Sequence, residues 1–195
     1  TATIGAGQAF DGSGQLQVRI RSPLAETLTL TVSEAGGLCT GAGTVTWSAN
    51  DLDVAATPTA RQMGQAVTLT LTARDANGDP IANYSPTAPI QVDATTSGGG
   101  TGVTFTGGSV VITDLGSGQG EIPASAVFDG SGRATIQVTN ANAEVIPLVV
   151  TESGASGSVA VGWTAHHFVL TPNPATGAAG TAINLTIEAQ DAANN

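Results

Sequence analysis

Lysine is absent from this 195-residue chain, and five arginines stand against 15 acidic residues, which gives a formal charge of −10. A surface of this charge repels phosphate backbones, so we exclude nucleic acid as a partner. Without lysine, no Lys–Asn or Lys–Asp isopeptide bond can form within the chain. Resistance to force would therefore depend on paired strands, packing between domains and bound ions.

Cysteine is almost absent too, because Cys39 is the only one. A single thiol cannot form an intrachain disulfide, so it serves either in an interchain bridge or as a loop thiol without a role. Apolar runs are short, and none approaches the ~18 residues that a membrane helix needs. We therefore expect no membrane insertion in this segment, and we expect any secretion signal to lie outside it.

Histidine occurs only at His166 and His167. As neighbours in a strand these side chains would point to opposite faces, so we expect no metal shared between them. The sequence contains no Ser-His-Asp, Cys-His or metalloprotease pattern. The Gly-rich run at 97–100 is followed by neither a lysine nor a helix start, so it is not a phosphate loop. These absences predict that the protein is not an enzyme.

Aromatic residues are scarce as well, with two Trp, one Tyr and four Phe. Sugar-binding sites commonly present aromatic rings for stacking. Tyr84 is the best candidate for such an exposed ring. A carbohydrate- or ligand-binding β-sandwich module therefore stays open as an alternative function, with a glycan or a cell-surface receptor as its partner.

What the chain does contain is an internal repeat. FDGSG occurs at 10–14 and again 118 residues later at 128–132, while Trp47 and Trp163 are 116 residues apart. At the first of these offsets, 13 of the first 36 residues match their counterparts. Self-similarity at a fixed period is typical of modular arrays. One structural unit is therefore about 116 residues long.

The phase of the repeat predicts three parts. Residues 1–50 would be the C-terminal part of one unit, 51–165 a complete unit, and 166–195 the N-terminal part of the next. An incomplete β-sandwich exposes apolar faces and unpaired strand edges. We therefore expect the terminal parts to be completed by further copies of the repeat, in the same chain or in neighbouring chains.

Within the unit, apolar and polar residues alternate with period two, as in Val67-Thr68-Leu69-Thr70-Leu71. This period predicts strands with one buried face. Further strands are expected near 88–93, 102–106, 109–113 and 158–163. About seven short strands separated by Gly, Pro, Asn and Asp predict an all-β fold of Ig-like antiparallel sandwiches. The residues expected inside are Leu69, Leu71, Ile136, Val138, Leu148 and Val150, and those expected outside are Thr68, Thr70 and Gln137.

The stretch VTLTLTARDANGDPIANYS at 67–85, followed by FDGSGRATIQVTN at 128–140, resembles the bacterial Ig-like repeats of invasin- and intimin-type adhesins. In those repeats a strand ends in an Asp-Ala-Asn-Gly turn, and a later Asp-x-x-Gly turn opens another strand. The Gly-rich segment at 97–118 departs from the compact version of that pattern. The resemblance implies a rigid, secreted rod module whose binding tip is usually carried elsewhere.

The junctions between units are short. The linkers at 48–53 and 164–169 contain no run of Gly or Ser, so we expect limited bending between stacked domains. Trp47 and Trp163 close successive units, and Phe168 opens the third. A tryptophan here would either cap its own core, the more common use of a buried aromatic, or pack against the next domain. For the second use, the candidates for interdomain packing are Trp47, Trp163 and Phe168.

Three oxygen-bearing side chains, Asp75, Asn77 and Asp79, alternate around Gly78. Calcium favours hard oxygen ligands supplied by a tight loop, so this turn is a candidate calcium site. The same sequence also suits an ordinary turn, because Asn-Gly tolerates positive φ. Asn184, in the sequon Asn-Leu-Thr, is a candidate for glycosylation. Apart from calcium, we expect no cofactor.

Taken together, these features predict a structural or adhesive repeat segment of a long secreted or cell-surface protein, forming a stalk or filament. A carbohydrate- or ligand-binding module is one alternative. A self-assembling fibre subunit completed by strands of neighbouring chains is another.

Overall fold

The computed structural model describes residues 10–22, 25–33, 40–95, 98–172 and 175–194. The regular elements of this part of the chain are all strands, as the alternation predicts. The strands are β1 (Glu26–Ser33), β2 (Thr40–Trp47), β3 (Asp51–Thr57), β4 (Ala60–Gln62), β5 (Val67–Arg74), β6 (Ile90–Asp93), β7 (Val103–Gly107), β8 (Thr113–Gly116), β9 (Gln119–Ile122), β10 (Arg133–Asn140), β11 (Val145–Glu152), β12 (Ala155–Thr164), β13 (His167–Thr171) and β14 (Thr186–Gln190).

Strands β3 to β12 form a sandwich of two sheets. One sheet has the order β3-β5-β10-β7, and the other has the order β4-β12-β11-β6-β9-β8. Between them lies a single core of apolar side chains. This arrangement confirms the predicted all-β Ig-like sandwich.

The alternation correctly predicted which side chains point inward. Leu69, Leu71, Ile136, Val138, Leu148 and Val150 are all fully buried. Thr68, Thr70 and Gln137 are partly exposed on the outer face of their sheet. There Gln137 Nε2 donates to Thr68 Oγ1 at 3.1 Å across the β5–β10 pair.

The predicted strand at 109–113 is wrong in position. The chain turns there, where Gly108 N donates to Val110 O at 3.1 Å, and β8 begins only at Thr113. Ser109 is held against β10, because its N donates to Thr135 O at 3.0 Å. Alternating Val110 and Ile112 suggested a strand, and both are indeed buried, but as parts of an irregular segment.

The first strand of the sandwich is divided between the two sheets. β3 pairs with β5 up to Thr57, and Pro58 then interrupts the ladder because it has no N–H to donate. The chain crosses over, and β4 pairs in parallel with β12, with Arg61 opposite Trp163. The N-terminal part of the sandwich is thereby hydrogen-bonded to its C-terminal strand, β12, within one sheet.

The terminal segments form two separate hairpins, and each keeps the register of its counterpart in the sandwich. Asp51 lies opposite Arg74 in β3–β5, and 116 residues later His167 lies opposite Gln190 in β13–β14. The β1–β2 hairpin likewise has the register of β11–β12 at offsets of 118 and 116. The strand-forming sequence therefore specifies these pairings without the rest of the unit.

The segment 15–22 behaves differently. It is the counterpart of β10 and has the same alternation, with Leu16, Val18 and Ile20, yet it is not in a strand. In the sandwich, β10 lies between β5 and β7 and pairs with both. Since 15–22 has neither neighbour, its backbone has no ladder to join.

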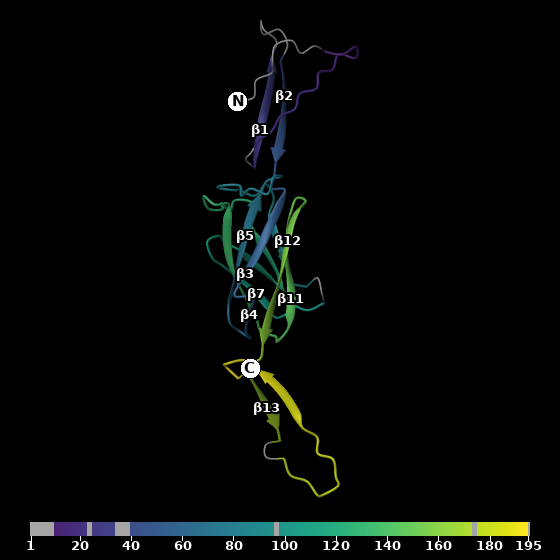
Figure 1. Ribbon diagram of the computed structural model, residues 1–195, viewed down its shortest axis with the longest axis vertical. Coiled ribbons are helices and arrows are strands. Elements are labelled where there is room, and N and C mark those ends of the chain that lie inside the picture. Colours follow the sequence, from purple (N-terminus) through teal and green to yellow (C-terminus); the bar gives the residue numbers. More distant parts are fainter. Residues whose placement is uncertain (1–9, 23–24, 34–39, 96–97, 173–174, 195) are drawn as a thin grey trace.

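Figure 1 shows these parts in line along the long axis, with β1–β2 beyond one end of the sandwich and β13–β14 beyond the other. β2 runs toward the sandwich, and β13 runs away from it (Figure 1). The described residues include no helix of the length and apolarity that crossing a membrane would require.

Candidate functional site at the junctions between repeats

The link between the first hairpin and the sandwich is held by two hydrogen bonds from its backbone N–H groups, one to a backbone carbonyl and one to a side-chain hydroxyl. Only 48–50 separate β2 from β3. Asn50 N donates to Arg74 O at 2.8 Å, and Ala49 N faces Tyr84 Oη at 3.5 Å. Ala49 is itself buried, at 5% exposure. The linker is therefore part of the end of the sandwich rather than a tether.

Tyr84 connects this linker to the core. Its hydroxyl donates to one carboxylate oxygen of Glu152, and the other oxygen accepts from Thr87 N at 2.8 Å. The Tyr84 ring also meets Phe128 edge-on, with ring centroids 5.3 Å apart. A buried carboxylate needs such donors because burial without them is costly. The network ties the linker to Glu152, the last residue of β11.

This placement overturns the prediction that Tyr84 is an exposed ring. Tyr84 is 1% exposed, and Phe105, Phe128 and Trp163 are also buried. The exposed phenylalanines are Phe10 and Phe168, both on the terminal segments, and Trp47 is partly buried. The sandwich itself presents no fully exposed aromatic ring for stacking on a sugar.

Burial, followed by the hydrogen bond to Glu152, raises the pKa of Tyr84 above its ordinary value of 10.0. A raised folded-state pKa means that folding favours the protonated hydroxyl. Its contribution to stability is therefore complete below pH ~10 and is lost as the pH rises further. Lysine is absent and Tyr84 is the only tyrosine, so few other groups titrate in this range.

We accordingly expect the free energy of unfolding of a Cys39→Ser variant to fall steadily above pH ~10. Adding Tyr84→Phe should remove most of this slope. It should also lower the stability at neutral pH by about 1–3 kcal/mol, because Glu152 loses a donor. Denaturant unfolding at a series of pH values measures both effects. An equal alkaline slope in the two proteins would contradict the assignment.

The second junction repeats the first. β12 ends at Thr164 and β13 begins at His167, and His166 N donates to Gln190 O at 2.8 Å, the counterpart of the Asn50 bond. Here the expected orientation of the two histidines is wrong. Their Nδ1 atoms lie 3.1 Å apart. His166 precedes β13, so its side chain does not follow the alternation of neighbouring residues in a strand.

Each junction also contains an Asp turn. Asp75 Oδ1 accepts from Asn77 N at 2.8 Å and from Asp79 N at 2.9 Å. In the third repeat, Asp191 Oδ1 accepts from Ala193 N at 2.8 Å. The backbone N–H groups of Asp79 and then Asn77 lower the pKa of Asp75. This carboxylate is thus ionised and held by its own turn.

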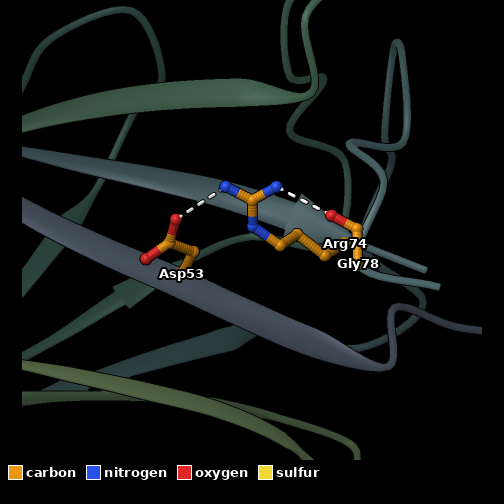
Figure 2. A network of polar contacts seen from close by, with 3 residues as sticks. All are labelled: Asp53, Arg74 and Gly78. Carbon is orange, nitrogen blue, oxygen red and sulfur yellow. Dashed lines mark hydrogen bonds and ion pairs between the residues drawn. The ribbon is translucent and has the colours of Figure 1, made fainter. Parts of the chain in front are cut away.

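Arg74 fastens the same turn to the first strand. Figure 2 shows its guanidinium between Gly78 and Asp53, donating to Gly78 O at 2.8 Å and to Asp53 Oδ2 at 2.8 Å. Both charged side chains are substantially exposed, so the ion pair itself contributes little to stability. Its main effect is to hold the turn in position beside β3.

The turn lines a cleft of about 350 Å³ between the first hairpin and the sandwich. Trp47 and Thr46 line it from the hairpin side, and Asp75, Ala76 and Ile81 line it from the sandwich side. An adjoining cleft also includes Asn77. At the second junction, Asp191 approaches Gly64 of the sandwich. The Asp turn of each unit therefore faces the unit before it.

The candidate calcium ligands lie close together, but Asp75 and Asn77 also bind each other, with Asn77 Nδ2 3.2 Å from Asp75 Oδ2. Asp79 contributes its backbone N–H and carbonyl to the turn. Among the described residues, no group of three or more His, Cys, Asp or Glu could hold a metal. Calcium binding through Asp75, Asn77 and Asp79 stays a prediction.

A melting-temperature comparison with calcium and with a chelator tests that prediction. An ion that binds only the folded state raises the midpoint by mass action. We expect a calcium-dependent rise that Asp79→Ala removes, since the alanine keeps the backbone bonds of the turn. A midpoint that is the same with calcium and with chelator would mean that the three residues form only a turn.

The remaining predicted residues lie in different surroundings. Trp163 is 2% exposed and caps its own core, with Nε1 donating to Gln65 O at 3.1 Å. Trp47 is partly buried beside the cleft, whereas Phe168 is 66% exposed. Asn184 is exposed on the approach to β14. Cys39 lies outside the described residues. Interdomain packing by these aromatic residues, and modification of Cys39 or Asn184, stay predictions.

Sequence reasoning missed the network of Ala49, Tyr84 and Glu152. One signal was present, because Glu152 and Glu34 are counterparts, and Ala49 recurs as Ala165. A glutamate retained at the end of an apolar strand in two copies indicates a buried partner. The partner itself, Tyr84, lies in an irregular loop where periodicity gives no information on burial.

No protein-family model matches the chain, and no curated protein matches it. Solved structures do. The Yersinia pseudotuberculosis adhesin InvE is 22% identical over 72% of this chain and 40% of its own, with a TM-score of 0.42. Invasin, a bacterial integrin-binding protein, is 18% identical over 84% of this chain and 37% of its own, with a TM-score of 0.37.

The S-layer protein SbsC is 18% identical over 88% of this chain and 20% of its own, with a TM-score of 0.34. The chain thus spans two fifths or less of each of these three proteins. Glycoside hydrolases also occur among the similar chains, at lower identity. The similar structures therefore include adhesins and S-layer proteins.

Proposed function

We propose that this chain is a load-bearing repeat segment of a stalk or filament on a cell surface or in the extracellular space. The observation that carries the proposal is the direction of the terminal strands. β3 enters the sandwich at one end of the long axis, and β12 leaves at the other (Figure 1). A force applied to the two ends of the chain acts along both strands.

In this geometry the hydrogen bonds of the terminal strands share the load. β3 has seven paired residues with β5, and β12 has eight with β11. A pull along a strand loads all its ladder bonds together, because none can break without the strand sliding as a whole. β4 adds a parallel ladder to β12, which links the N-terminal side of the sandwich directly to its C-terminal strand.

The junctions support the same role. Each is two or three residues long and is held by the same backbone hydrogen bond, from Asn50 to Arg74 and from His166 to Gln190. Short linkers of this kind allow little bending, so successive repeats would remain in line. The features that recur at both junctions are a backbone hydrogen bond and an Asp turn, and both orient one repeat relative to the next. This supports a structural role over a catalytic one.

Single-molecule pulling tests the proposal. With handles at Asp51 and Thr164, we expect the sandwich to resist and then rupture in one step, releasing roughly 3.3–3.6 Å per residue of extended chain. The control uses handles at Val145 and Thr164, which unzips the β11–β12 hairpin bond by bond. Rupture in the first geometry at a force no higher than in the control would contradict a load-bearing role.

A further inference from the structure

The Asp turn of the sandwich contains the only Asn-Gly pair of the sequence, Asn77 and Gly78. An asparagine side chain loses ammonia when the backbone nitrogen of the next residue attacks its amide carbon. A glycine in that next position favours the attack, because it has no Cβ to shield its nitrogen. The pair is therefore a candidate for a covalent change that needs no enzyme.

The surroundings of the pair are open. Asn77 and Gly78 are both exposed at the tip of the turn. Gly78 has a φ of +87°, and apart from its chain neighbours no described atom lies within 4 Å of the position that a Cβ would take. Water therefore reaches the pair, and a local opening of the turn displaces no packed side chain at the glycine.

Asp75 holds both reacting groups. Its carbonyl oxygen accepts from Gly78 N at 3.0 Å, and its carboxylate Oδ2 accepts from Asn77 Nδ2 at 3.2 Å. Its other carboxylate oxygen accepts from Asn77 N at 2.8 Å, which fixes the backbone of the asparagine. The attacking nitrogen and the amide are thus tied to Asp75, and these bonds must open before the two groups can react.

We propose that Asn77 is a site of spontaneous deamidation and that the turn bonds of Asp75 limit its rate in the folded protein. In the first step the nitrogen of Gly78 bonds to Cγ of Asn77, and the Cγ–Nδ2 bond breaks. The proton of the Gly78 N–H leaves with the amide group as ammonia, which closes a succinimide ring. In the second step water opens the ring at either carbonyl. The product is an aspartate, or an isoaspartate in which the main chain runs through Cγ.

The change alters the bonds that position the turn. A carboxylate at position 77 has no N–H to donate to Asp75 Oδ2, and it carries the same charge as that group. An isoaspartate adds one carbon to the main chain before Gly78, which displaces the carbonyl that accepts from Arg74 at 2.8 Å (Figure 2). Deamidation therefore adds negative charge to the turn and loosens its attachment to β3 through Arg74.

The third repeat lacks the reactive pair. The counterparts of Asn77 and Gly78, 116 residues later, are Ala193 and Asn194. Asp191 still accepts from Ala193 N at 2.8 Å, as Asp75 does from Asn77 N. The Asp turn thus forms without an asparagine at this position. Of these two turns, the one at the first junction is the one that deamidation would change.

Mass spectrometry of peptides from the incubated, folded chain tests the site. We expect the peptide that contains Asn77 to gain the mass difference between an amide and an acid, and fragmentation to show both aspartate and isoaspartate. Asn50 and Asn83 are internal controls, because the next residues, Asp51 and Tyr84, have side chains that shield their nitrogens. These two asparagines should stay intact. Equal conversion of all three would overturn the assignment of a specific site.

Asp75→Ala tests the control by the turn. The folded variant should convert Asn77 roughly tenfold faster than the native sequence, the effect of losing one hydrogen bond to a charged group. The matched control is Asp129→Ala, which removes a carboxylate that accepts from Ser131 N at 2.8 Å and from Arg133 N at 2.9 Å. It should leave the rate at Asn77 unchanged. Equal rates in folded Asp75→Ala and the native sequence would overturn the role of Asp75.

A second measurement needs no variant. Denaturant opens the turn, so the native sequence should convert Asn77 faster in denaturant than when folded. An equal rate in the two conditions would mean that the turn gives no protection, and an unchanged Asn77 in denaturant would overturn the proposal altogether.

Asn77→Asp, which matches the product with a normal main chain, tests the consequence. Amide exchange at Gly78 should be faster in this variant than in the native sequence, whereas exchange at Leu148 in the core should not change. Equal exchange at Gly78 would mean that the added charge does not loosen the turn. None of these measurements applies a load, so their failure would leave the stalk function to be judged by the pulling experiment.

Discussion

Leu148→Ala is expected to lower the free energy of unfolding of the sandwich by about 2–5 kcal/mol, the usual cost of a large-to-small change in a packed core. Leu148 lies in the middle of β11 and is fully buried. Its strand is paired on both sides, with β12 and with β6. Since the neighbouring strands are fixed by these ladders, the core cannot collapse easily into the space that the leucine leaves.

Val145→Ala provides the matched control, because Val145 starts the same strand but is 74% exposed. Surface changes of this kind usually alter stability by less than about 0.5 kcal/mol. Denaturant unfolding of the two variants, followed by the fluorescence of buried Trp163, gives the comparison. Equal stability of Leu148→Ala and the native sequence would mean that β11 does not face a common core.

Period-two alternation predicted the buried faces of β5, β10 and β11 because each of these strands has one face on the core and one toward solvent. The repeat offsets predicted which segments correspond, and the terminal hairpins keep the registers of their counterparts. Local sequence carries this information, since a one-residue slip would turn every apolar side chain outward.

The features that the sequence did not reveal are those set by contacts between distant segments. β4 has three residues, Ala60–Gln62, with no apolar alternation, and it forms a strand because β12 offers it a free edge. Tyr84 was the best candidate for an exposed ring among the few aromatic residues, yet Glu152 and the linker at Ala49 draw it inward. The segment 15–22 shows the converse, with a strand-like sequence and no strand.

The sequence predicted the residues of the candidate site but not the position of the site relative to the neighbouring unit. The turn at Asp75–Asp79 was visible from its spacing, but the sequence could not show that it faces the preceding unit across a cleft lined by Trp47. Nor could spacing distinguish a carboxylate that binds an ion from one that accepts the amides of its own turn. Asp75 accepts amides of its own turn, and its counterpart Asp191 accepts the amide of Ala193, while calcium binding at Asp75 stays a prediction.

Gly157→Ala is expected to destabilise the sandwich strongly, although it adds a single methyl group. The new Cβ would overlap the carbonyl oxygen of Leu52 and crowd Val54, and the obstacle is backbone that cannot rotate away. Overpacking of a filled interior costs about 1–3 kcal/mol and occasionally more. The sheets would have to separate locally, which would weaken the packing of β3 on β12.

Gly41→Ala is the control for this change, since Gly41 occupies the same position in the first repeat and has open space around it. In the single chain this variant should unfold at the same denaturant concentration as the native sequence. The two glycines therefore have opposite sensitivities for one reason, the presence or absence of a β3-type strand beside them. If Gly157→Ala were as stable as Gly41→Ala, β3 would not pack on β12 as closely as described.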